Sequence, residues 1–187
     1  MEQKSRQRAH LERILLVCGQ PNAGKSRLIR QMFSDPRLAG VAPGNGPLGR
    51  YSLSRERCLA GRITSPHEME ETPVVFHEKI DEACKHAWNQ FWRINYVSAV
   101  QPGRRGAMPA IVDLCTGLVD AFMPERIRVV QLVPDQKGDE DSCLSLADID
   151  GLRAIDVEVL TIDARRRANH DAEPGNVRIL ADFFDFS

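Results

Sequence analysis

Hydrophobic and polar positions change their spacing along the chain and predict strands and helices in alternation. An apolar run over 14–18 predicts a buried strand at about 13–18, and apolar residues at helical spacing follow over 25–34. Polar and apolar residues alternate over 50–64, which predicts two short strands forming an antiparallel hairpin. Later strands are predicted over 109–113, 127–133, 157–162 and 177–180, and later helices over 116–123 and 145–154.

A long helix is predicted from Pro73, with Thr72 as its N-cap. Apolar side chains at three- and four-residue steps carry this helix into the nineties, where residues 96–97 either continue it or begin a short strand. Four aromatic residues accompany this stretch: Trp88, Phe91, Trp92 and Tyr96. At such spacing an aromatic cluster is more typical of core than of a binding surface.

The order of these elements predicts an α/β fold with a mostly parallel sheet, folded as a single domain over residues 1–187. Ligands of such sheets bind at the carboxyl ends of the strands, so we expect residues 19–26, 113 and 135 to gather there. The segment 35–49 is rich in glycine and proline and predicts a long loop. Loops of this length in compact domains are often functional.

The composition adds limits on location and partners. Hydrophobic residues make up 42% of the chain and charged residues 27%, which is typical of a soluble globular protein. The net charge of −1 gives no general attraction to nucleic acid or anionic membrane, and no apolar run could span a bilayer. The five cysteines lie far apart and suggest neither a zinc site nor a disulfide framework. We therefore expect buried free thiols and a cytoplasmic location.

The residues from Gly19 to Ser26 carry the clearest chemical signal. They follow a predicted strand and precede a predicted helix, the context in which G-x-x-x-x-G-K-[ST] indicates a phosphate-binding loop. The glycines let the backbone curl around an anion, and the loop N–H groups and the helix N-terminus point at the phosphates. Lys25 can place a positive charge between the β- and γ-phosphates, and the hydroxyl of Ser26 can bind Mg²⁺.

This stretch resembles the first motif of the translation-factor-related (TRAFAC) GTPases, in which G-x-P-N-x-G-K-S is frequent, and the predicted element order is similar to theirs. The resemblance implies a three-layer P-loop NTPase fold that binds GTP or ATP with Mg²⁺, together with a protein partner. It also implies a catalytic role for Lys25. The nucleotide-binding residues that it implies are Gly19, Gln20, Pro21, Asn22, Ala23, Gly24, Lys25, Ser26 and Arg27.

The chain departs from this family at two later motifs. Residues 63–68 lack the aspartate that holds Mg²⁺ in the family, although His67 lies close to the place of a water-orienting histidine. His67 is either such a catalytic residue or an exposed turn histidine. Asp135 could accept a hydrogen bond from guanine, but the Asn-Lys pair that accompanies this aspartate in the family is missing. We therefore expect a nucleotide-dependent switch with weak or no hydrolysis, in which the 35–49 loop changes order.

Two alternatives remain open at this stage. The predicted strand over 109–113 ends in Asp113, so it could be a Walker B strand whose acid binds Mg²⁺ in a small-molecule kinase or ATPase. The arginines over 165–167 could then contact a phosphate, or they form a solvated loop. In the second alternative the chain is a non-catalytic partner subunit that has kept the loop as scaffold.

Overall fold

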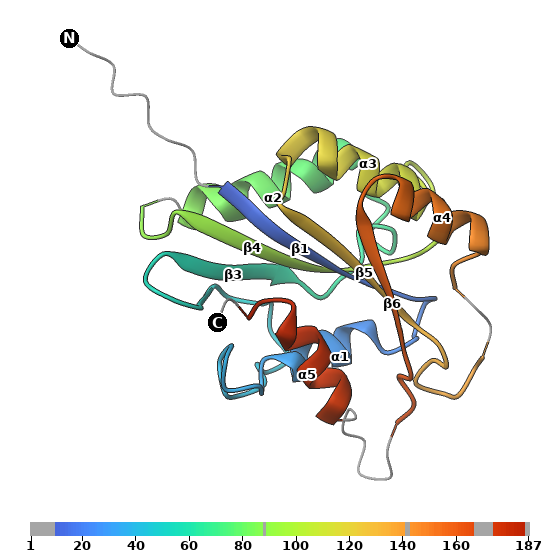
Figure 1. Cartoon of the computed structure of the whole chain (residues 1–187), viewed down its shortest axis with the longest axis horizontal. Coiled ribbons are helices and arrows are strands. Elements are labelled where there is room, and N and C mark those ends of the chain that lie inside the picture. Colours follow the sequence, from blue (N-terminus) through green and yellow to red (C-terminus); the bar gives the residue numbers. More distant parts are fainter. Residues whose placement is uncertain (1–9, 88, 141–142, 167–173, 186–187) are drawn as a thin grey trace.

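A computed structural model of the chain describes residues 10–87, 89–140, 143–166 and 174–185. Within these ranges it is an α/β protein, with a sheet of six strands and five helices (Figure 1). The strands are β1 (His10–Cys18), β2 (Tyr51–Ser52), β3 (Arg57–Arg62), β4 (Arg93–Val100), β5 (Arg126–Leu132) and β6 (Val157–Ile162). The helices are α1 (Lys25–Met32), α2 (Pro73–Ala87), α3 (Ile111–Phe122), α4 (Leu146–Ala154) and α5 (Pro174–Asp182).

The sheet is mostly parallel, and its strand order is β2-β3-β4-β1-β5-β6. Among these described strands only β2 and β3 pair antiparallel, which confirms the predicted hairpin. The first strand lies inside the sheet, with Ile14 opposite Tyr96 of β4 and Ile127 of β5. Because all six strands except β2 run in one direction, the segments that follow them meet at one edge.

Helices cover both faces of the sheet and give a layered architecture (Figure 1). The first layer contains α2, α3 and α4, and the second contains α1 and α5. Successive side chains of β1 point to opposite faces: Ile14 and Leu16 pack with the first layer, while Leu15 and Val17 pack with the second. This two-sided burial explains why the first strand is a continuous apolar run in the sequence.

The prediction of a long helix into the nineties is wrong. Helix α2 begins at Pro73 as expected, and the Thr72 hydroxyl accepts a hydrogen bond from the backbone N–H of Val75. The helix ends at Ala87, however, and residues 93–100 form β4, which is buried along nearly its whole length. Tyr96 is therefore a core residue, whereas Trp92 is 60% exposed at the start of the strand. Trp88 lies outside the described residues.

Two short apolar runs predicted as strands are helical instead. Residues 109–113 do not form a strand. Pro109 and Ala110 precede α3, and Asp113 lies in the first turn of that helix. Residues 177–180 belong to α5, in which Val177, Leu180 and Ala181 pack toward the sheet. The expected strand 157–162 and the expected helix 145–154 are both confirmed. Among the described helices, none combines the length and apolar character needed to cross a membrane.

Candidate functional site

The loop between β1 and α1 is shaped by two residues with positive φ, Asn22 and Gly24. Gly24 has φ 99° and is the N-cap of α1. A Cβ added to Gly24 would lie 3.1 Å from the Cβ of Gln136, so both the backbone conformation and the close neighbour favour glycine. The loop is held to the sheet by the N–H of Gly19, which donates to the carbonyl of Val100 at 3.3 Å.

Lys25 lies inside this loop. Its side chain is only 4% exposed, and the ammonium donates to the carbonyl oxygens of Gly19 at 2.9 Å and Gln20 at 2.8 Å. The carboxylate of Glu68 lies 3.4 Å from the same ammonium. Burial lowers the pKa of Lys25, and the nearby charge of Glu68 partly offsets this effect. A buried cation is thus enclosed by the loop that the sequence predicts to bind phosphate.

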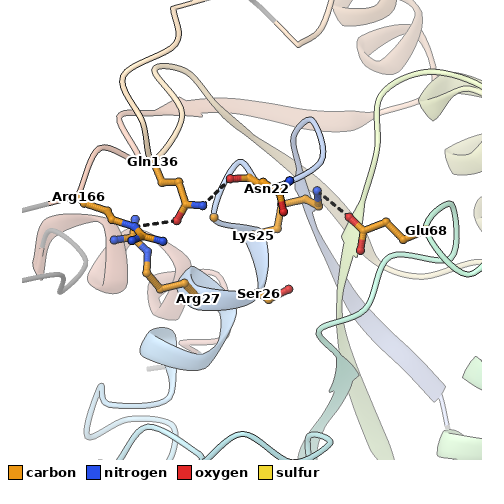
Figure 2. Close-up of a pocket in the computed structure, with 8 residues that line it drawn as sticks. Asn22, Lys25, Ser26, Arg27, Glu68, Gln136 and Arg166 are labelled. Carbon is orange, nitrogen blue, oxygen red and sulfur yellow. Dashed lines mark hydrogen bonds and ion pairs between the residues drawn. The ribbon is translucent and has the colours of Figure 1, made fainter.

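A pocket of about 260 Å³ opens in front of this loop (Figure 2). Its walls come from the segments that follow β1, β3, β5 and β6, and thus from one edge of the sheet. The lining residues are Asn22, Gly24, Lys25, Ser26, Arg27, Glu68, Gln136 and Arg166. Ligand pockets commonly measure roughly 300–1,000 Å³, so this volume suits a polyphosphate group better than a whole nucleotide.

Gln136 and two arginines form one wall of the pocket. The backbone N–H of Gln136 donates to the carbonyl of Ala23 at 3.1 Å, and its side-chain amide donates to the carbonyl of Asn22. The guanidinium of Arg166 donates to the side-chain oxygen of Gln136 at 3.0 Å, and that of Arg27 donates to the carbonyl of Ala164 at 2.7 Å. The wall therefore carries positive charge and is fixed by hydrogen bonds to the loop (Figure 2).

The residues present fit a Mg²⁺ ion that arrives with a phosphate ligand. Ser26 donates its hydroxyl to the carbonyl of Ile63 at 2.8 Å, and its oxygen keeps lone pairs that can face a cation. In the described part of the chain, no group of three or more His, Cys, Asp or Glu side chains could hold a metal alone. Mg²⁺ usually keeps several waters and binds one or two protein groups plus substrate phosphates. Ser26 and Glu68 are the candidates here.

His67 is buried, so the interpretation as an exposed turn histidine is wrong. Its Nε2 lies 3.0 Å from the carbonyl of Pro109, which can only accept a hydrogen bond, so Nε2 carries the hydrogen and donates. Its Nδ1 then accepts from the backbone N–H of Gln101 at 3.4 Å. Burial lowers the pKa of His67, which favours the neutral ring that these bonds require. His67 does not line the pocket, and its bonds hold the backbone that precedes Glu68.

The two predicted aspartates do not line the pocket. The carboxylate of Asp135 accepts from the backbone N–H groups of Lys137 at 2.7 Å and Asp139 at 3.0 Å, so it shapes its own loop. Asp113 is exposed on α3, which covers the opposite face of the sheet from α1. A Walker B strand ending in Asp113 is therefore absent, because this described stretch is helical.

Sequence reasoning missed Glu68 and Gln136, and it gave Arg166 only as one of three arginines that could contact a phosphate. Gln136 directly follows Asp135, which the sequence places at this edge, and Arg166 belongs to an arginine run that could contact a phosphate. Arg165 pairs with Asp163 instead, and Arg167 lies outside the described residues. For Glu68 the chain offers no local signal, because its partner Lys25 is distant in sequence.

The fold and pocket define an α/β protein with a mixed six-stranded sheet and a polar site at the carboxyl edge of its parallel strands. Comparison with protein-family models, with curated proteins and with solved structures gave no match. The function of this chain must therefore be inferred from the geometry of this site.

Proposed function

We propose that this chain binds a nucleoside di- or triphosphate together with Mg²⁺ and acts as a nucleotide-dependent switch with weak or no hydrolysis. The observation that carries the proposal is the buried ammonium of Lys25, enclosed by the loop from Gly19 to Ser26. Burying a charge costs free energy unless partners compensate it, and such groups concentrate at functional sites. A polyphosphate is the ligand whose charge this lysine complements best.

The start of α1 supports an anionic ligand. Within the described ranges no side chain caps this helix, and its first turn contains no acidic residue. The first N–H groups of a helix have no partner within the helix, and its N-terminus carries partial positive charge. Arg27 and Arg166 add further positive charge to the same pocket. Backbone donors, helix dipole and side chains thus all favour negative charge at one place.

The pocket supports binding more than rapid turnover. Among its described lining residues Glu68 is the only carboxylate, and it already pairs with Lys25. A general base must reach the attacking water, and the described lining contains no second acid and no histidine. The alternative of a kinase or ATPase that uses Asp113 loses its basis, because the required strand does not form.

The loop after α1 is the segment that we propose to report the nucleotide state to a protein partner. Residues 35–49 are described throughout and contain no helix or strand, as expected. Arg30 of α1 donates to the carbonyl oxygens of Gly44, Asn45 and Gly46. The loop is therefore tied to the helix whose N-terminus faces the pocket. Guanine and adenine are both compatible with this proposal, since the carboxylate of Asp135 is engaged in its own loop.

The direct test is binding of GTP, GDP, ATP and ADP, each with and without Mg²⁺, by calorimetry and thermal shift. We expect at least one nucleotide to bind and to raise the melting temperature. Lys25→Ala should weaken that binding about ten- to a hundred-fold, because a charge-assisted hydrogen bond contributes roughly 1.5–3 kcal/mol. Lys137→Ala is the matched control, because it removes an exposed charge close to the loop.

Circular dichroism should show that both variants keep the fold. If no nucleotide binds, or if folded Lys25→Ala binds as tightly as wild type, the loop is not a nucleotide site. That outcome would favour a partner subunit that uses the loop as scaffold.

A further inference from the structure

The Lys25 ammonium has three polar partners in the protein: two hydrogen-bond acceptors and one ion-pair partner. The acceptors are the carbonyls of Gly19 at 2.9 Å and Gln20 at 2.8 Å, and the ion-pair partner is the carboxylate of Glu68 at 3.4 Å. The charge that the proposed function requires is therefore already paired with a carboxylate. A phosphate that approaches Lys25 competes with Glu68 for this cation.

Glu68 is the partner that can leave. The two carbonyls belong to a loop that is fixed to the sheet through Gly19 and to the β5–α4 connection through Gln136. The side chain of Glu68 is 34% exposed, and its second contact, from the side-chain amide of Gln101, is also long at 3.4 Å. A phosphate at this place would in addition repel the carboxylate, since both are negative. Glu68 thus competes with an anionic ligand for Lys25.

The backbone around Glu68 is held on both sides, so the competition involves its side chain. The N–H of Glu68 donates to the carbonyl of Ser65 at 3.1 Å, and the preceding His67 is bonded to Pro109 and Gln101. On the other side, Glu71 forms an ion pair with Arg62 at 2.7 Å. The backbone of Glu68 is therefore fixed beside the pocket, and only its side chain needs to move when it leaves Lys25.

We propose that Glu68 makes this site select metal-complexed over metal-free polyphosphate, an inference that rests on the proposed nucleotide function. A metal-free polyphosphate must displace Glu68 from Lys25 and then lie beside an uncompensated carboxylate. A Mg²⁺ complex carries less negative charge and brings a cation for which carboxylate oxygen is a preferred ligand. Because Ser26 lines the same pocket, both groups suited to Mg²⁺ face the space where the phosphates would bind.

The experiment compares wild type, Glu68→Gln and Glu70→Gln by calorimetry at constant ionic strength. The probe is inorganic tripolyphosphate, measured once with a chelator and once with excess MgCl₂. Glu70 is the matched control, because it is an exposed carboxylate in the same turn and does not line the pocket. We expect Glu68→Gln to raise the metal-free affinity about tenfold and to reduce the preference for the Mg²⁺ complex, since it removes like-charge repulsion. Glu70→Gln should bind as wild type does.

The outcomes separate this inference from the function on which it rests. An unchanged ratio of the two affinities in Glu68→Gln, or a weaker metal-free affinity, would overturn the role of Glu68 and leave the binding site intact. An equal effect of Glu70→Gln would also overturn it, because the effect would then reflect net charge alone. If neither form of tripolyphosphate binds to folded wild-type protein, the proposed function itself fails, and the inference fails with it.

Discussion

Replacing Gly24 with alanine tests whether the loop needs the backbone conformation seen here. Gly24 has φ 99°, a region that side chains rarely adopt, and the added Cβ would lie 3.1 Å from Gln136. Holding an L-residue in such a conformation costs about 1–3 kcal/mol. The lower conformational entropy of the unfolded alanine chain returns about 0.4–1 kcal/mol. From the middle of these two ranges, the net loss of stability should be about 1–2 kcal/mol.

This loss is large enough to measure by unfolding in urea and by thermal denaturation. For a chain of this length, each kcal/mol moves the melting temperature by about 2–4 °C, so we expect a decrease of about 2–8 °C. Gly49→Ala is the control, because apart from its own chain neighbours no atom of the described residues lies within 4 Å of the new methyl group, and its φ lies outside the left-handed region. It should leave stability unchanged or slightly raised.

A second variant separates the two causes of the loss. Adding Gln136→Gly to Gly24→Ala removes the close contact, whose nearest atom is the Cβ of Gln136, but leaves the unfavourable φ at Gly24. The double variant should therefore recover only part of the stability when compared with Gln136→Gly alone. If Gly24→Ala unfolds at the same urea concentration as wild type and Gly49→Ala, the left-handed conformation at Gly24 is not required, and the description of this loop is wrong.

Four further predictions concern the site, the sheet and the thiols. Ser26→Ala should weaken only the Mg²⁺-dependent part of nucleotide affinity; equal losses with and without Mg²⁺ would contradict this. Glu12→Gln should destabilise the protein by about 1–2 kcal/mol in urea unfolding, because buried Glu12 pairs with Arg57 at 3.0 Å and Arg93 at 2.6 Å, while both arginines remain partly in contact with water. Burial alone would raise the pKa of Glu12 and Glu71, but hydrogen bonds from basic side chains outweigh burial and lower both pKa values. The stability that these two carboxylates contribute is therefore fully present above their ordinary pKa of 4.5, and it is lost as the pH falls through the lowered pKa values. When unfolding is measured from pH 7 to pH 3, the urea concentration at the midpoint should decrease once the pH is below 4.5. In Glu12→Gln this decrease should be smaller than in wild type. The five cysteines are buried and free, so a thiol reagent should label them only after unfolding; rapid labelling of the native protein would contradict their burial.

Much of the fold can be predicted from the sequence, because in several helices and strands the spacing of the apolar residues fits only one kind of secondary structure. The buried strand before Gly19 and the helix after it follow directly from their apolar spacing, and Ser145 with Asp148 forms the capping box that begins α4. Simple alternation predicts the hairpin. These elements are specified by local pattern, and the structure adds only their order in the sheet.

The elements that sequence reasoning missed are short apolar runs whose period is ambiguous. In residues 177–180 the apolar positions fit alternation, yet Val177 and Leu180 also lie three residues apart on one helix face. Tyr96 lies four residues after Trp92, a spacing that favours a helix, although the run is buried on both faces as in a central strand. Only packing against neighbouring elements decides between such periods.

The candidate site also has one part that the sequence predicts and one part that it does not. The loop and Lys25 are contiguous in sequence and follow from their motif, whereas Glu68 reaches Lys25 only because the segment after β3 crosses the edge of the sheet. The identity of such a partner is a property of the tertiary structure. Asp113 is the opposite case. The sequence pattern places it at the end of a strand, where an acid could bind Mg²⁺, but in the structure it lies in the first turn of α3.

The position of β1 inside the sheet has a consequence for synthesis on the ribosome. The ribosome makes β1 before both of its neighbours in the sheet, β4 and β5. Ile14 therefore cannot form its native strand pairing until Tyr96 and Ile127 have been synthesised. At about 5–20 residues per second, the wait for β5 is on the order of ten seconds. During this time the apolar strand is unpaired, and the loop that follows it has no sheet on which to form. A nascent chain that stops before Arg126 should therefore need a chaperone to stay dispersed, and a strand translated before both of its neighbours acquires its native pairing only after them.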